Sequence, residues 1–175
     1  RENGLVMAPG GFQGEDAVIL AAEAFSRTGN LADYLKIKPT NDVYLKVMAA
    51  AQDRQTGNYN AFWAKRNYRP AIKNIKCAVM LVHGLNDDNV KPNQAKALYD
   101  GLIVQGAHPK VILHQGQHIY INAFQSLDFA EMVNLWLAHH LWGLANGADE
   151  LLPNVLVQDN RQPQTWHPAD QWDGT

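Results

Sequence analysis

The chain has 175 residues, of which 46% are hydrophobic and 18% are charged, and its formal net charge at pH 7 is −2. This is the composition of an ordinary globular protein, without the basic clusters that mark nucleic-acid-binding proteins and without an apolar run near the roughly 18 residues that a membrane-spanning helix needs. We therefore expect neither a nucleic-acid partner nor a membrane partner.

The first part of the chain is predicted to be a loop followed by helices. Residues 1–14 contain four glycines, which indicates a glycine-rich loop. Residues 15–76 are interpreted as a helical insertion, because two apolar, Ala-rich stretches at 15–27 and 41–54 are each followed by a glycine. A turn is predicted at 39–42, where proline, threonine, asparagine and aspartate are adjacent.

The next segment, residues 77–150, alternates strand and helix patterns. The run 78–82 is continuously apolar, as expected of a strand buried in a parallel sheet, and 110–113 is predicted to be a second short strand. A helix is predicted to open at Pro92 between them, and a long apolar helix is expected over 126–142. Strand, helix, strand, helix implies a right-handed parallel unit, so the predicted fold class is α/β.

The last segment, residues 151–175, is predicted to be the entry to a following domain. Its apolar run at 155–158 is interpreted as a lone strand of that further domain. Trp166 and Trp172 have no predicted element to pack against. Because residue 1 is Arg1 rather than Met, we also expect the sequence to be a piece of a longer chain.

Two polar loops, 83–90 and 114–120, follow the two predicted strands. Open α/β sheets place their ligands at these strand ends. A serine nucleophile needs an imidazole to take its proton, and that imidazole needs a carboxylate on its other nitrogen. Asp87 or Asp88 on the first loop and His118 on the second fit the last two members of the order Ser, Asp, His in an α/β-hydrolase. The alternative is that both aspartates are ordinary turn residues.

The other histidines have simpler interpretations. His114 lies four residues before His118, but that spacing joins metal ligands on a helix, and here it crosses Gly116 after a strand. His83 is interpreted as a satisfied residue at a strand end, and the pair at 139–140 as side chains favoured at a helix C-terminus. We expect no metal site and no cofactor.

The motifs resemble those of the Xaa-Pro dipeptidyl-peptidases of lactic acid bacteria. The resemblance is carried by Val-His-Gly-Leu-Asn-Asp-Asp-Asn-Val at 82–90, Gly-Gln-His-Ile-Tyr at 116–120, Arg-Glu-Asn-Gly-Leu-Val at 1–6 and Pro-Gly-Gly-Phe-Gln-Gly-Glu-Asp at 9–16. It extends over almost all of residues 1–160. It implies that the glycine-rich loop at 1–14 lies at the substrate site and that residues 151–175 are the start of a β-rich C-terminal domain. It implies the C-terminal part of an α/β-hydrolase domain, from a cytoplasmic serine peptidase that releases dipeptides ending in proline from free peptide N-termini.

The resemblance also implies roles for single residues. In related oligopeptidases the first aspartate of the pair is catalytic, which favours Asp87 over Asp88 as the residue that orients His118. Glu15 falls in the pocket that holds the substrate's free amine, although by itself it reads as a first-turn helix carboxylate. Asn89 is expected to donate a hydrogen bond to a backbone carbonyl of the substrate.

No residue of this chain is predicted to be the nucleophile. The sequence contains two serines, Ser26 and Ser126, and neither lies in a Gly-x-Ser-x-Gly motif; both read as helix or cap residues. The resemblance places the nucleophile upstream of Arg1. The isolated chain is therefore predicted to be inactive.

Two other functions stay open at the level of the sequence. One is a related ester or acyl-amide hydrolase, which would not need an amine-binding Glu15. The other is a non-catalytic α/β module in which Asp87 and Asn89 only form a turn. A homodimer of the full-length chain is left open. The single cysteine, Cys77, directly precedes an apolar strand and is expected to be buried and reduced.

Overall fold

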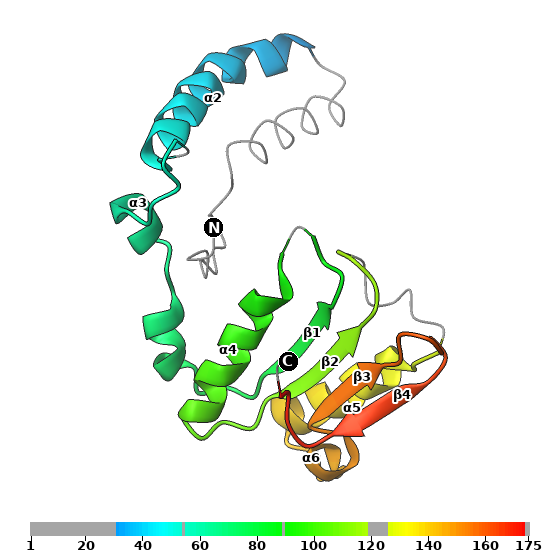
Figure 1. Cartoon of the computed structure of the whole chain (residues 1–175). Helices are drawn as coiled ribbons and strands as arrows, with labels where there is room; N and C mark the ends of the chain where they lie inside the picture. The colour runs from blue at the N-terminus through cyan, green and yellow to red at the C-terminus, as the bar shows by residue number, and fades with distance from the viewer. Residues whose placement is uncertain (1–30, 54, 89, 119–125, 174–175) are drawn as a thin grey trace. The chain divides into compact units, whose positions relative to one another are not determined.

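The computed structural model describes residues 31–53, 55–88, 90–118 and 126–173. The chain divides into two compact units, residues 1–69 and residues 70–175, and each is described by itself (Figure 1). The predicted loop at 1–14 and the predicted helix at 15–27 lie outside the described residues.

The described part of the first unit contains one long helix and one short helix. Helix α2 runs over Leu31–Ala51 and passes through Pro39, so the predicted turn at this position is wrong. A proline removes one helix hydrogen bond and bends the helix, but it does not force a turn when the flanking residues stay helical. Lys38 and Asp42 form an ion pair one helical turn apart across this position.

The short helix α3, Ala61–Ala64, begins at a well-formed cap. The side-chain oxygen of Asn60 accepts hydrogen bonds from the backbone N–H groups of Phe62 and Trp63, at 2.9 and 3.3 Å. These bonds satisfy two donors that have no partner inside the helix.

The second unit is built on a four-stranded sheet with the strand order β1-β2-β3-β4. Its strands are β1 Met80–Gly84, β2 Lys110–His114, β3 Val155–Gln158 and β4 Trp166–Ala169. The pairs β1–β2 and β2–β3 are parallel and the pair β3–β4 is antiparallel. The predicted α/β fold class is confirmed. Both predicted strands that precede the polar loops are present, as β1 and β2.

Helices cover the sheet on both sides. After the 3-10 helix η1, Arg69–Asn74, helix α4 spans Pro92–Val104 and joins β1 to β2. Helix α5, Phe129–Trp142, lies on the opposite side of the sheet from α4 (Figure 1). Pro92 opens α4 and Gly143, in the left-handed conformation at φ 68°, closes α5, both as predicted. A short helix α6, Ala148–Leu151, precedes β3.

The end of the chain packs on the same unit, which corrects the prediction of a lone strand at 155–158. Strand β3 pairs in parallel with β2, with Val155 opposite Val111. Trp172 packs against Tyr99 of α4, with ring centroids 5.8 Å apart, and the indole N–H of Trp166 donates to Ser126 Oγ at 3.0 Å. The partners of these residues lie more than 30 residues away in sequence, where a local pattern gives no signal. The broader division of the chain into an insertion and parts of two domains stays a prediction.

The core of the second unit lies between α4 and the sheet. Tyr99, Val111, Leu113 and Val155 are almost completely buried in one cluster. Cys77, by contrast, is a free and exposed cysteine, so the prediction of a buried thiol is wrong. The strand begins three residues later, at Met80, and the residues before it lie on the surface.

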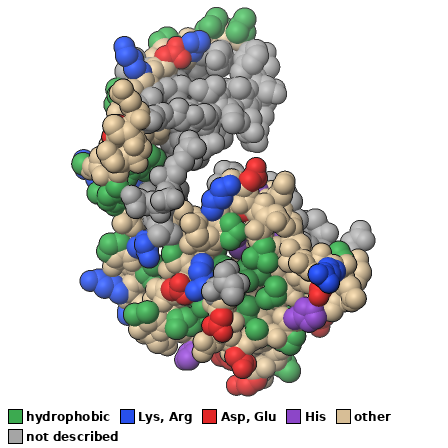
Figure 2. All heavy atoms as spheres, viewed as in Figure 1, with side chains coloured by type: hydrophobic (Ala, Val, Ile, Leu, Met, Phe, Trp, Pro, Cys, Tyr) green, Lys and Arg blue, Asp and Glu red, His purple; other side chains and the backbone are tan. Residues whose placement is uncertain are grey.

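The surface carries mixed charge. On the face of the second unit shown in Figure 2, acidic and basic side chains are interspersed among hydrophobic ones. In the part of the chain that the structure describes, no helix is both long and apolar enough to cross a membrane.

Candidate active site

A tight turn after β1 holds the side chain of Asp87. The backbone N–H of Asp87 donates to the carbonyl of Gly84 at 3.2 Å, and Asp87 Oδ1 accepts from the backbone N–H of Val90 at 2.9 Å. Aspartate side chains form this kind of bond readily with nearby backbone donors. The Asp87 side chain is only 4% exposed, so its carboxylate is fixed before any partner binds.

His118 follows the neighbouring strand, and its Nδ1 lies 2.9 Å from Asp87 Oδ2. The two strands are parallel and in register, with Gly84 opposite His114, so the loops after them meet at one edge of the sheet. Asp88, the other candidate, is exposed. The predicted hydrogen bond between Asp87 and His118 is therefore present.

The two loops touch through their backbones. A Cβ atom on Gly84 would lie 2.5 Å from the carbonyl oxygens of both Gly116 and Gln117, so only glycine fits at this position. Leu85 N–H donates to His114 O at 2.7 Å and joins the loops at the same point. Gly84, the last residue of β1, was not singled out in the sequence, because the atoms that require a glycine here belong to the neighbouring strand and loop.

Two further histidines border the site and have local partners. His83 Nε2 lies 2.9 Å from the carbonyl of Val90, which agrees with a satisfied strand-end residue. His114 is 2% exposed, and its Nδ1 accepts from the backbone N–H of Gly116 at 3.1 Å. Burial lowers the pKa of His114, and the nearby His83 lowers it further, while Asp87 opposes the shift. His114 therefore favours the neutral form.

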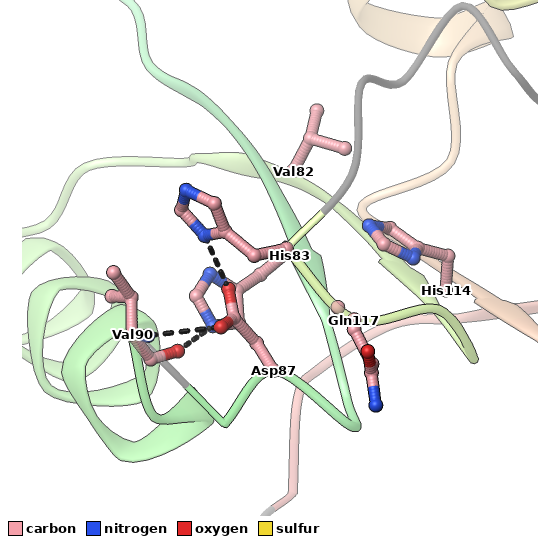
Figure 3. A pocket seen from close by; sticks show the side chains of 8 residues that line it. Val82, His83, Asp87, Val90, His114 and Gln117 are labelled. Atoms are coloured by element: carbon pink, nitrogen blue, oxygen red, sulfur yellow. Dashed lines mark hydrogen bonds and ion pairs between the residues drawn. The ribbon is translucent and has the colours of Figure 1, made fainter. Parts of the chain in front are cut away.

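An open pocket lies over these loops (Figure 3). In this view His83, Asp87 and Val90 lie on one side of the pocket, and His114 and Gln117 lie on the other. The residues that line it are Val82, His83, Gly84, Asp87, Val90, His114, Gln117 and His118.

The geometry determines which nitrogen of His118 can act as a base. An ionised carboxylate only accepts hydrogen bonds, so Asp87 requires the proton of the neutral imidazole to sit on Nδ1. The lone pair is then on Nε2, on the far side of the ring. The His118 side chain is 62% exposed, so a reacting group can approach it. This is the tautomer that a serine-activating histidine needs.

The structure brings together some of the predicted site residues and leaves others untested. Glu15, Asn89 and Ser26 lie outside the described residues. Ser126 is not a helix cap: its hydroxyl donates to the carbonyl of Pro163 and accepts from Trp166, both at 3.0 Å. Helix α5 begins three residues later and is capped by Asp128, whose side chain accepts from Glu131 N–H.

A protein-family model matches more than half of this chain. Residues 1–120, which include both Asp87 and His118, match the model described as X-Pro dipeptidyl-peptidase (S15 family). The chain belongs to this X-Pro dipeptidyl-peptidase family. It is similar over 98% of its length to proteins named Xaa-Pro dipeptidyl-peptidase, with 56% identity for the protein of Lactiplantibacillus plantarum. The corresponding identities are 54% for Ligilactobacillus salivarius and 42% for Lactobacillus helveticus. The chain spans about a fifth of the length of these curated relatives, 21–22%.

Proposed function

We propose that the protein is a serine peptidase that releases N-terminal dipeptides ending in proline, and that this chain supplies the aspartate and histidine of its triad. The observation that carries the proposal is the 2.9 Å bond between Asp87 and His118, in a chain that belongs to the X-Pro dipeptidyl-peptidase family. The names of the relatives support the choice of substrate.

In this proposal His118 Nε2 takes the proton of a serine hydroxyl as the serine oxygen attacks the carbonyl carbon of the substrate's proline. The imidazolium that forms keeps its Nδ1 proton on Asp87, whose negative charge stabilises it. Nε2 then gives its proton to the leaving amine, and water releases the dipeptide from the acyl-enzyme by the same steps. The nucleophile belongs to a part of the protein outside this chain, in agreement with the greater length of the relatives.

Two more residues complete the proposed site. Glu15 binds the ammonium of the substrate N-terminus, and Asn89 donates to a backbone carbonyl of the peptide. A peptidase that requires a free amine needs an anion at this position, because a desolvated ammonium is costly without a partner. Both assignments rest on the family resemblance.

The pair Asp87 and Asp88 offers a matched test of the triad. In the full-length protein, Asp87→Asn should lower kcat for an aminoacyl-prolyl chromogenic amide by about four orders of magnitude, because the wrong imidazole tautomer is then favoured. Asp88→Asn changes an exposed side chain one residue away and should cost less than about threefold, as surface substitutions do. Equal losses in the two variants, or no loss in Asp87→Asn, would remove Asp87 from the triad.

Glu15→Gln tests the substrate class in the full-length protein. Loss of one partner of a buried charge pair costs roughly 2–5 kcal/mol, which is about 30- to several-thousand-fold in kcat/KM for an aminoacyl-prolyl amide. Hydrolysis of a neutral ester, which has no ammonium, should be largely spared. If Glu15 is only a first-turn helix residue, both substrates will show the same small effect.

A cytoplasmic site of action and a homodimer of the full-length chain are further parts of this proposal. The first rests on the family resemblance, and subcellular fractionation with an antibody to the chain tests it. The second is tested by the molar mass of the full-length protein in light scattering.

A further inference from the structure

A second cluster of titratable side chains lies at the junction of helices α5 and α6, apart from the Asp87–His118 pair. His139 Nε2 is 3.3 Å from Asp149 Oδ2, and His140 Nε2 is 3.4 Å from Asp149 Oδ1. One ligand atom from each residue can be chosen so that all three lie within 4.8 Å of one another. The sequence placed the two histidines at a helix end but gave no sign that Asp149 joins them.

The hydrogen bond on the other side of the His139 ring determines which of its nitrogens carries the proton. His139 Nδ1 lies 2.9 Å from the carbonyl oxygen of Leu144. A carbonyl only accepts, so Nδ1 carries the proton, and Nε2 of the neutral ring presents a lone pair to the carboxylate of Asp149. Two acceptors facing each other are held together only by a positive charge between them, either a proton on Nε2 or a metal ion. A bound cation supplies that charge, and an imidazole held by a backbone carbonyl is the usual arrangement of a metal-binding histidine.

The His–Asp distances show that neither histidine forms a hydrogen bond of normal length with Asp149. Both His–Asp separations, 3.3 and 3.4 Å, are longer than a normal N–H···O bond of about 2.7–3.2 Å. The two separations involve different oxygens of Asp149, and one ligand atom from each residue spans up to 4.8 Å. Ligand atoms about 2.0–2.1 Å from a tetrahedral zinc ion lie about 3.3–3.4 Å from one another, so the three side chains must close around an ion that binds here. The exposed pair His167 and Asp159 shows the contrast: here a single imidazole nitrogen lies 2.9 Å from the carboxylate.

The backbone around the cluster is held in place by bonds that do not involve its ligand atoms. Asn146 joins the two helices, because its amide donates to Leu135 O at 2.8 Å and its side-chain oxygen accepts from Ala148 N–H at 3.1 Å. The Lys110 ammonium donates to the backbone carbonyl of Asp149 at 2.6 Å. These bonds hold the backbone of the cluster in place, so only side-chain movement is needed when an ion binds.

We propose that His139, His140 and Asp149 bind a divalent transition-metal ion, with zinc as the best match, and that water completes the coordination. Two imidazoles and one carboxylate suit zinc, whereas calcium and magnesium prefer sites made of oxygen ligands. The three side chains are 30%, 23% and 54% exposed, so an ion can reach them from solvent. The C-terminal end of α5 also favours a cation. The ion fastens α6 to the end of α5 and is independent of the proposed peptidase reaction.

The test is a zinc titration of the purified full-length protein in competition with a chromogenic chelator. The wild type should bind one zinc ion that His140→Ala and Asp149→Asn bind at least about tenfold more weakly, since even the loss of an outer partner of a metal ligand costs about 10–100-fold. His167→Ala removes an imidazole from a two-residue His–Asp pair and should leave this zinc ion in place. His118→Ala checks that zinc is not bound at the Asp87 site instead.

A stability measurement accompanies the titration. Zinc that binds the folded state raises the melting temperature of the wild type, and it should raise that of His167→Ala equally but not that of His140→Ala. Circular dichroism without zinc shows whether each variant is folded; if Asp149→Asn is not, the partly exposed His140→Ala decides alone. Unchanged zinc affinity in His140→Ala, or the same loss in His167→Ala, would overturn the proposal.

Discussion

Asp87 shows how a single position can be predicted in part from sequence. The pattern of a strand followed by Asp-Asp indicated a carboxylate at the strand end, and the family resemblance selected the first of the two. The physical reason appears in the turn: Asp87 Oδ1 accepts from Val90 N–H, which directs Oδ2 to His118. Asp149 could not be predicted in the same way, because its pairing with two histidines depends on how two helices meet.

The buried side chain of His114 makes the stability of the fold depend on pH. Burial is the main cause that lowers its pKa below the usual 6.5, so the folded state resists protonation of this ring. Between the lowered pKa and 6.5 the unfolded chain binds more protons than the folded one, and stability therefore rises with pH in this window. The contribution is fully present above about pH 6.5 and is lost as pH falls through the folded pKa.

We therefore expect His114→Asn to be less sensitive to acid than the wild type. Asparagine keeps an acceptor for the Gly116 N–H group but cannot titrate. The slope of unfolding free energy against pH should be smaller in the variant, by at most about 1.4 kcal/mol per pH unit for one proton. Urea denaturation at several values between pH 5 and pH 8 measures both slopes. Parallel curves would show that His114 does not carry this pH dependence.

At the scale of elements, most local signals predicted the structure correctly, whereas the pairing of distant segments was missed. The start of α4 at Pro92 and the end of α5 at Gly143 were predicted because proline and glycine act on their own backbone. Pro39 gave the opposite result, since its flanking residues continue the helix. The place of β3 beside β2 was missed because parallel pairing joins segments about 45 residues apart, as with Val111 and Val155.

In the candidate site, too, the loops were predicted from local sequence, and some contacts between distant residues were missed. Its two loops were predicted from the strands that precede them, and parallel neighbours bring such loops together at one edge of the sheet. The backbone contact at Gly84, where a Cβ would lie 2.5 Å from two carbonyl oxygens, could not be anticipated from a pattern. The histidine–aspartate cluster at the end of α5 was also missed, because its third member enters only through the turn into α6.

At the scale of the whole molecule, the second unit holds its strands and helices together partly through one buried lysine. Lys110 opens β2 and is 6% exposed. Its ammonium donates to the carbonyls of Asp149 and Leu152, at 2.6 and 2.8 Å, and to Asn154 Oδ1 at 3.1 Å. Three donors on one side chain thus connect the first residue of β2 to α6 and to the loop that leads into β3.

We expect Lys110→Met to destabilise this unit by roughly 2–5 kcal/mol, because methionine fills a similar volume but leaves these buried acceptors without the ammonium. Lys96→Met is the matched control: Lys96 pairs with Asp100 on the surface of α4, and such pairs contribute about 1 kcal/mol or less. Hydrogen exchange of the β2 and β3 amides in the full-length protein measures the difference. Exchange should rise about 30-fold or more in Lys110→Met, at 1.4 kcal/mol for each factor of ten, and about fivefold or less in Lys96→Met. If the two variants exchange alike, the bonds of Lys110 do not hold the unit together, and its burial follows from the packing around it.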